Sequence, residues 1–315
     1  MTRRLAALTG AALVLTAGLV TIPPAAACGC GGFATPAGTV AGMDIIGEQA
    51  VISLVDGTER VQIGLDAISD APQAALVIPT PTPAEAALGT SEVFTALQTL
   101  AQPQPKEVSV WWPKFGIGWG AGAPDGVGAS GVEVFQEVKL GPLEVVSLGS
   151  DSLEDLLAWL EQRGFELSSA LSEGMQDYVA DGWSFVAIKL SPDSAEFDGE
   201  IPPVELTFDS DELIYPMRLS AAATTMQRVR TYVVADSRVD RTDVQGEDAE
   251  LLFAGPLDAQ AEPDLADWAE PFGDAAYVTA HEQDFWDPEE EVVADFTFAT
   301  SSTQGDFHRT YEVEV

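Results

Sequence analysis

Val204-Glu205-Leu206-Thr207-Phe208, Leu213-Ile214-Tyr215 and Val229-Arg230-Thr231-Tyr232-Val233-Val234-Ala235 make up the most strand-like part of this chain. These segments are rich in β-branched and aromatic residues, which favour β-strands. The first two are separated by Asp209-Ser210-Asp211, a group of residues typical of turns. The stretch therefore predicts several neighbouring strands.

Strand patterns continue toward the N-terminus. Apolar positions from Val51 to Val55 and from Val61 to Leu65 flank Asp56-Gly57, and this dipeptide favours a tight hairpin because both residues tolerate positive φ. The apolar run Ala75 to Ile78 predicts a buried strand that ends at a proline-rich loop. A second hairpin is expected around Gly141-Pro142.

Three stretches show helical spacing of apolar residues: Val93 to Leu100, Leu153 to Leu160 and Ser172 to Ala180. The second is preceded by Ser152, which stands with Asp155 at the spacing of a capping box. The sequence therefore predicts an α+β fold that is β-rich, with mainly antiparallel sheets and two or three helices.

The N-terminus has the pattern of an export signal. Arg3-Arg4 leads into the uncharged apolar run Leu5 to Ile22, which stops at two prolines and is followed by small residues up to Ala27. This arrangement is typical of a signal peptide rather than of a membrane-spanning helix. We expect residues 1–27 to be removed, and the mature chain to begin at Cys28 and to be secreted or to lie on the outer face of the cell envelope.

Cys28 and Cys30 are the only cysteines. An exported protein meets oxidising conditions, so a local disulfide between them is one interpretation, although its small ring would be strained. A lipid attached to Cys28, a link to a partner protein and a soft-metal site completed by a partner are the alternatives.

The chain carries 51 acidic and 14 basic residues, a formal net charge of −37. Such a charge repels phosphate backbones and anionic lipid surfaces, which excludes nucleic-acid binding as a function class. Hydrophobic residues make up 46% of the chain, enough for a sizeable core despite the charge.

The balance of charge shifts after residue 239. From Asp240 onward the chain has many acids against only Arg241 and Arg309, yet apolar residues persist. We therefore expect a β-rich core domain over residues 28–239 and a strongly acidic C-terminal extension over residues 240–315 that packs on the core. Residues 260–270 are expected to be loose.

Three groups of residues carry a family resemblance: Cys28-Gly29-Cys30-Gly31-Gly32-Phe33, Leu76-Val77-Ile78-Pro79-Thr80-Pro81, and Ile214-Tyr215-Pro216-Met217-Arg218-Leu219-Ser220 leading to Val229–Val239. Together they resemble the exported bacterial family called domain of unknown function 2330, over roughly residues 28 to 239. The resemblance implies an exported location. It implies no activity, catalytic residue or ligand.

Other patterns have simpler interpretations. Gly126-Val127-Gly128-Ala129-Ser130-Gly131 matches a dinucleotide-binding loop, but a strand pattern follows it where a helix is needed, so we expect a surface loop. His281 and His308 each have acidic neighbours that could orient an imidazole, yet no triad or zinc-site motif accompanies them, and we expect two lone surface histidines.

The acidic clusters and the tryptophans each have a structural and a functional interpretation. Asp209 and Asp211, and the run Glu289-Glu290-Glu291, are expected to be solvated surface, and no calcium-loop motif exists. Trp111-Trp112 and Trp119, beside a glycine-rich stretch, could line a sugar-binding groove or fill the core.

These observations favour a non-enzymatic interaction module of the cell envelope or the secreted fraction, acting on an unknown envelope or extracellular partner. The alternatives are a carboxylate-based hydrolase of an extracellular polymer and a weak divalent-cation binder. The sequence assigns no catalytic residue, no cofactor, no metal ligand and no transmembrane segment beyond the signal.

Overall fold

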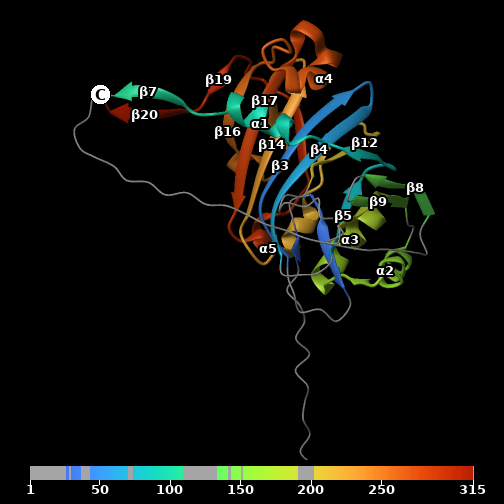
Figure 1. Cartoon of the computed structure of the whole chain (residues 1–315). Coiled ribbons are helices and arrows are strands. Elements are labelled where there is room, and N and C mark those ends of the chain that lie inside the picture. Colours follow the sequence, from blue (N-terminus) through green and yellow to red (C-terminus); the bar gives the residue numbers. More distant parts are fainter. Residues whose placement is uncertain are drawn as a thin grey trace, which may run out of the picture.

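The computed structural model describes residues 26–27, 30–36, 43–69, 74–108, 133–140, 143–149, 152–190 and 202–314. Two large β-sheets face each other, and helices cover the outer face of each sheet (Figure 1). The result is four layers in the order helices, sheet, sheet, helices. Most strand pairs are antiparallel, so the prediction of a β-rich α+β fold with mainly antiparallel sheets is confirmed.

The larger sheet has eight strands within the described residues, in the order β19-β16-β17-β14-β3-β4-β12-β6. Its centre is the parallel pair β3 and β14, and the other neighbours are antiparallel. The strands are β3 (Met43–Val55), β4 (Thr58–Ser69), β6 (Glu85–Leu88), β12 (Val204–Asp209), β14 (Gln227–Ala235), β16 (Glu250–Pro256), β17 (Tyr277–Phe285) and β19 (Phe307–His308).

The second sheet has seven described strands in the order β1-β2-β5-β11-β9-β8, with β10 added to β2. The hairpin of β8 and β9 is the one predicted around residues 141–142, although those two residues lie outside the described part of the chain. The strands are β1 (Ala26–Ala27), β2 (Gly32–Pro36), β5 (Ala74–Thr80), β8 (Glu133–Leu140), β9 (Leu143–Gly149), β10 (Phe165–Glu166) and β11 (Ser184–Leu190).

Two small sheets complete the strands. The strands β13 (Leu213–Tyr215), β18 (Phe296–Thr300) and β15 (Val239–Arg241) form a three-stranded antiparallel sheet, with β18 in the middle. The strands β7 (Gln104–Val108) and β20 (Thr310–Glu314) form a two-stranded parallel ribbon.

Helices cover both outer faces. The larger sheet is covered by α1 (Ser91–Leu100) and α4 (Ala266–Ala269), and the second sheet by α2 (Leu153–Glu161) and α3 (Ser169–Ala180). The described residues hold five α-helices, so the expected two or three was too few. The additional ones, α4 and α5 (Pro288–Glu291), are single turns that are too short to show a periodic apolar pattern. No described helix combines the length and apolar character that a membrane crossing needs.

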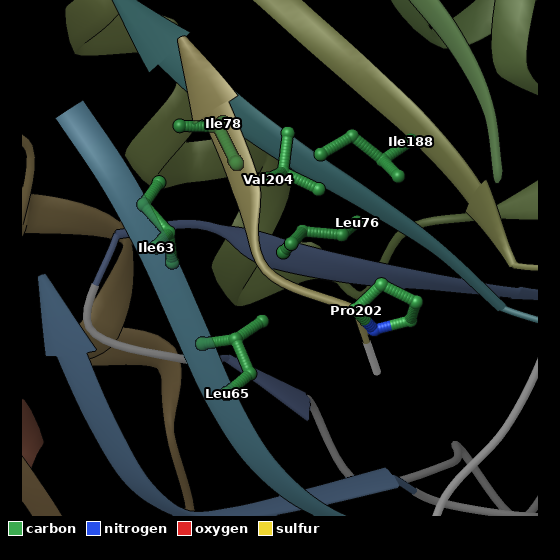
Figure 2. Close-up of a pocket in the computed structure, with 7 residues that line it drawn as sticks. All are labelled: Ile63, Leu65, Leu76, Ile78, Ile188, Pro202 and Val204. Carbon is green, nitrogen blue, oxygen red and sulfur yellow. The ribbon is translucent and has the colours of Figure 1, made fainter. Parts of the chain in front are cut away.

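The central core lies between the two sheets. Alternate side chains of β14 are buried on opposite faces of the sheet. Val229 and Val233 face the second sheet, whereas Tyr232 and Val234 face α1. This double burial explains why the second half of β14, residues 232–235, is a continuous apolar run. Figure 2 shows where side chains of both sheets converge on a small apolar space, lined by Ile63, Leu65, Leu76, Ile78, Ile188, Pro202 and Val204.

The segment after residue 239 contributes to the interior of the larger sheet. The strand β17 pairs with β14 along its whole length and with β16 on its other edge. The stretch 260–270, which was expected to be loose, instead forms the 3-10 turn η3 (Pro263–Leu265) and then α4. Leu265 and Trp268 anchor it, since both side chains are buried against the sheet.

Candidate functional site

The candidate site is built on the segment that links β13 to the 3-10 turn η1 (Arg218–Ala222). Tyr215 of β13 pairs with Phe296 of β18, which brings Asp295 beside the backbone of Met217. Glycine at position 174 lets α3 approach η1 closely, because a Cβ there would lie 3.1 Å from Leu219 Cδ2.

Asp295 is the hydrogen-bonding centre of this region. Its Oδ1 accepts hydrogen bonds from the backbone N–H groups of Met217 at 2.7 Å and Arg218 at 3.1 Å, and from the hydroxyl of Tyr178. Its Oδ2 accepts a hydrogen bond from Arg218 Nε at 2.8 Å. Burial and the neighbouring Asp295 carboxylate raise the pKa of Tyr178 well above its ordinary value, so Tyr178 acts as a permanent donor.

Arg218 is held on several sides. Besides Asp295, its NH1 donates to Asp181 Oδ2 at 2.8 Å, and its guanidinium lies 4.0 Å from the ring centre of Tyr178 and 5.7 Å from that of Trp183. The Arg218 side chain remains 24% exposed. A cation stacked on aromatic rings and paired with two carboxylates has little freedom to move, so Arg218 is a fixed feature of the surface.

An open hollow lies beside Arg218, between α3, η1 and α5. Its empty space is about 1030 Å³, including the part open to solvent. Small side chains form much of the lining, and three exposed carboxylates, Glu173, Asp177 and Glu289, face it. We call this feature the Arg218 hollow, and its lining residues are Ala170, Glu173, Gly174, Asp177, Arg218, Ala221, Ala222, Ala223, Thr224, Glu289, Val292 and Val293.

The same segment is tied to the inter-sheet core. The Tyr215 hydroxyl donates to Glu48 Oε1, and Cys30 lies next to it. Burial, with further contributions from Cys30 and Glu48, raises the pKa of Tyr215 well above its ordinary value. On the other side of β13, the backbone N–H of Ile214 donates to the fully buried carboxyl of Glu59, whose pKa burial raises well above 4.5. The polar groups of the core thus fix the position of β13.

The apolar space in Figure 2 is a packing gap rather than a ligand site. It has room for no more than about one water molecule, and its lining offers almost no polar surface.

Of the two cysteines, only Cys30 lies within the described residues. Cys30 is 1% exposed and packs in the core between the sheets. Cys28 lies outside the described residues, so the disulfide and the lipid attachment remain predictions.

His281 is buried, which contradicts the expectation of a surface histidine. Its Nδ1 has no hydrogen-bond partner among the described residues, and burial, assisted by Arg241, lowers the pKa of His281 to about 4. The adjacent acids Glu282 and Asp284 pair with Arg230 and Arg228 instead. They therefore do not orient the imidazole.

His308 is exposed, as expected, at the far edge of the larger sheet. It contacts the ring of Phe253 and the amide of Gln104, while its sequence neighbour Asp306 accepts a hydrogen bond from Tyr277. Neither histidine lines the Arg218 hollow.

A buried ion pair lies close to His281. Arg241 donates from Nε and NH2 to both carboxylate oxygens of Asp243 at 2.6 and 2.7 Å, and each side chain is 2% exposed. The guanidinium covers the ring of Phe296 at 3.3 Å, and Asp243 also accepts a hydrogen bond from the backbone N–H of Thr297. These groups secure the three-stranded sheet rather than line a cleft.

Several predicted features do not meet in one place. Trp111, Trp112 and Trp119 and the glycine pattern 126–131 lie outside the described residues. Of the run Glu289-Glu290-Glu291, the first lines the Arg218 hollow. Within the described part of the chain, no group of three or more His, Cys, Asp or Glu residues is placed to hold a metal ion.

The sequence did not single out Arg218, Asp295, Asp181 or Tyr178. The one available signal was the stretch from Ile214 to Ser220, which contains Arg218 and carried the family resemblance. Arginine and lysine are scarce in this chain, 14 in 315 residues, so an arginine within that stretch was the strongest local clue.

Fold and site together define a four-layer α+β protein in which a buried carboxylate fixes an arginine beside an open hollow. The chain belongs to the family described as "Uncharacterized protein conserved in bacteria (DUF2330)", whose model matches residues 24–299. The match extends past Val239, where the expected resemblance ended, and includes every segment that lines the Arg218 hollow. No curated protein matches the chain. The crystal structure of baculovirus P35 is similar at 8% identity and a TM-score of 0.33, covering 85% of this chain and 97% of that one.

Proposed function

We propose that the protein is exported and acts as a non-enzymatic interaction module of the cell envelope or the secreted fraction. We further propose that the Arg218 hollow binds a basic segment of its partner. The observation that carries this proposal is the hollow itself: a wide concavity floored by small side chains and faced by three carboxylates on rigid elements.

Export is supported by the N-terminal sequence. The basic head, the apolar run and the small residues before Cys28 are the features that signal peptidases recognise. The lipid and disulfide alternatives at Cys28 both remain compatible with an exported protein.

A basic partner is supported by local and global charge. Among the described residues, Glu173, Asp177 and Glu289 are exposed and form no ion pair, whereas Arg218 is already paired with Asp181 and Asp295. The whole chain adds a field of formal charge −37. Such a field favours the approach of cationic groups and repels anionic ones.

A binding role fits these residues better than hydrolysis. A hydrolase of the carboxylate type needs a general acid held away from water, but the three carboxylates of the hollow are all exposed. Both histidines lie elsewhere in the described structure, so the hollow has no imidazole to act as a general base.

The experiment compares two variants of equal net charge. One neutralises the hollow (Glu173→Gln, Asp177→Asn, Glu289→Gln), and the control neutralises three exposed acids elsewhere (Glu85→Gln, Glu247→Gln, Asp264→Asn). The probe is trilysine, titrated by calorimetry at near-physiological salt.

Three exposed charge pairs together are worth about 1.4 kcal/mol, so the hollow variant should bind trilysine about tenfold more weakly. The control variant should stay close to the wild type. Equal weakening in both variants would mean that trilysine responds only to the total charge and that the hollow is not the site.

A further inference from the structure

The ribbon of β7 and β20 stands away from the two large sheets (Figure 1). Within the described residues the two strands pair only with each other, in parallel, from Gln104 with Thr310 to Val108 with Glu314. An isolated two-stranded arrangement is at best marginally stable in water, and its edges offer unpaired backbone groups. A third strand would therefore stabilise this ribbon.

The base of the ribbon is fixed to the body. The backbone N–H of Gln104 donates to the carbonyl of Arg309 at 2.9 Å, and the N–H of Arg309 donates to the carbonyl of Leu252 in β16 at 3.1 Å. Arg309 also pairs with Glu250 at 3.1 Å. These contacts fix which side of each strand faces the other.

The backbone register shows that the two outer edges differ. Because the N–H of Gln104 points to β20, the alternate residue Pro105 places its backbone on the outer edge of β7. Proline has no N–H, so this edge lacks a donor, a common device against strand pairing. On β20, the residues whose backbone faces outward are Thr310, Glu312 and Glu314, and none of them is proline.

The charges of β20 determine which kind of strand can pair with its outer edge. Antiparallel pairing of the whole strand with a second copy would place Glu312 opposite Glu312, and like charges directly opposite each other are destabilising. Two of the three outward-bonding residues are glutamates. An incoming strand with lysine or arginine at alternate positions would be attracted to this edge and an acidic one repelled.

We propose that the outer edge of β20 is a strand-addition site for an extended, basic segment of a partner protein. Main-chain hydrogen bonds supply affinity in this mode of recognition, and alternate side chains supply selectivity. The strand lies beyond residues 24–299, the range that the family model matches. The site is separate from the Arg218 hollow, whose lining residues all fall inside the matched range.

The test uses a fluorescein-labelled peptide of alternating lysine and valine, with an alternating glutamate and valine peptide for comparison. The variant Glu312→Pro removes an outward N–H of β20 while leaving the hydrogen bonds to β7. Glu107→Pro is the matched control, since it removes the same charge and an outward N–H from the edge that Pro105 already blunts. Fluorescence anisotropy at near-physiological salt should show binding of the lysine peptide weakened about tenfold by Glu312→Pro and nearly unchanged by Glu107→Pro.

Hydrogen exchange shows where the peptide binds. The amides of Tyr311 and Val313, which face β7, should be protected in the wild type and in Glu312→Pro, while those of Glu312 and Glu314 should gain protection only when the lysine peptide is bound to the wild type. Unprotected Tyr311 and Val313 amides in the wild type would overturn the proposal, because the ribbon would then not exist to be extended.

Other outcomes are equally decisive. Absence of binding by the lysine peptide, equal binding of the acidic peptide, or equal effects of the two proline variants would each overturn the proposal. A wild-type dimer that Glu312→Pro dissociates would assign the edge to a second copy instead. Binding that survives both proline variants and is lost on neutralising the Arg218 hollow would support that hollow and refute this edge.

Discussion

The ion pair of Arg241 and Asp243 should be far more important for stability than the outwardly similar pair of Arg228 and Asp284. Both pairs are bidentate, with hydrogen bonds of 2.6 and 2.7 Å in the first and 2.6 and 2.8 Å in the second. They differ in burial. Each side chain of the first pair is 2% exposed, whereas Arg228 is 48% exposed and Asp284 27%.

The variant Asp243→Ala leaves the guanidinium of Arg241 buried without its counter-ion. Loss of one partner from a buried pair costs about 3–5 kcal/mol, and the N–H of Thr297 loses an acceptor as well. Asp284→Ala should cost about 0–1 kcal/mol, because water and salt already screen the exposed pair. The double variant Arg241→Met with Asp243→Leu should recover most of the loss, since no unpaired charge then remains.

Urea unfolding followed by tryptophan fluorescence measures these differences through the midpoint at constant m-value. A loss of 3–5 kcal/mol is a large fraction of the total stability of an ordinary protein, so the shift should be easily resolved. The reasoning is refuted if Asp243→Ala and Asp284→Ala shift the free energy of unfolding by the same amount, or if Asp243→Ala costs less than about 1 kcal/mol.

Further predictions concern pH, a turn and the leader. Because the pKa of His281 is lowered from 6.5 to about 4 in the folded state, the unfolded state binds more protons between those values. The free energy of unfolding of the wild type should therefore be unaffected by His281 above pH 6.5 and should fall by about 3 kcal/mol as the pH drops to 4. Urea midpoints of His281→Gln should lack that pH dependence. The pKa of Glu59 is raised above 4.5, so here the folded state binds more protons and stability falls as the pH rises. Glu59→Gln should therefore stabilise the protein near neutral pH but not below pH 4.5. Equal effects of the substitution at the two pH values would contradict this. Gly57 has φ +83°, so Gly57→Ala should lower the unfolding free energy by about 1 kcal/mol, and an unchanged value would argue against this turn. Mass spectrometry of the mature protein should find Cys28 at the N-terminus, with or without a lipid, and retention of the leader would refute the export proposal.

Features fixed by neighbouring residues could be predicted from the sequence. Asp56 and Gly57 both adopt positive φ and join β3 to β4 in the hairpin that the dipeptide indicated. Ser152 caps α2 by accepting a hydrogen bond from the N–H of Asp155 at 3.4 Å, as the capping-box spacing suggested. In both cases the signal and its structural effect lie within a few residues of each other.

Features that depend on distant residues could not be predicted. Asp295 meets Arg218 across 77 residues, and no local pattern marks either as the partner of the other. His281 was expected on the surface, with acidic neighbours that could orient it, but alternation along β17 turns Glu282 toward Arg230 and His281 into the core. The face that a strand buries depends on which strands pair with it. The partners of β17 are β14 and β16, and no local sequence pattern identifies them.

The parallel contact between β3 and β14 delays completion of the fold until most of the polypeptide is present. The strand β3 ends at Val55, and its partner begins only at Gln227, so a shorter nascent chain holds a long hairpin with one edge unsatisfied. Strand pairings between residues this far apart in sequence form slowly, because the entropy of closing a large loop is lost before the strands make stabilising contacts. Under the export that we propose, this order of strands would delay folding until most of the chain had been made, which suits transport in an extended form.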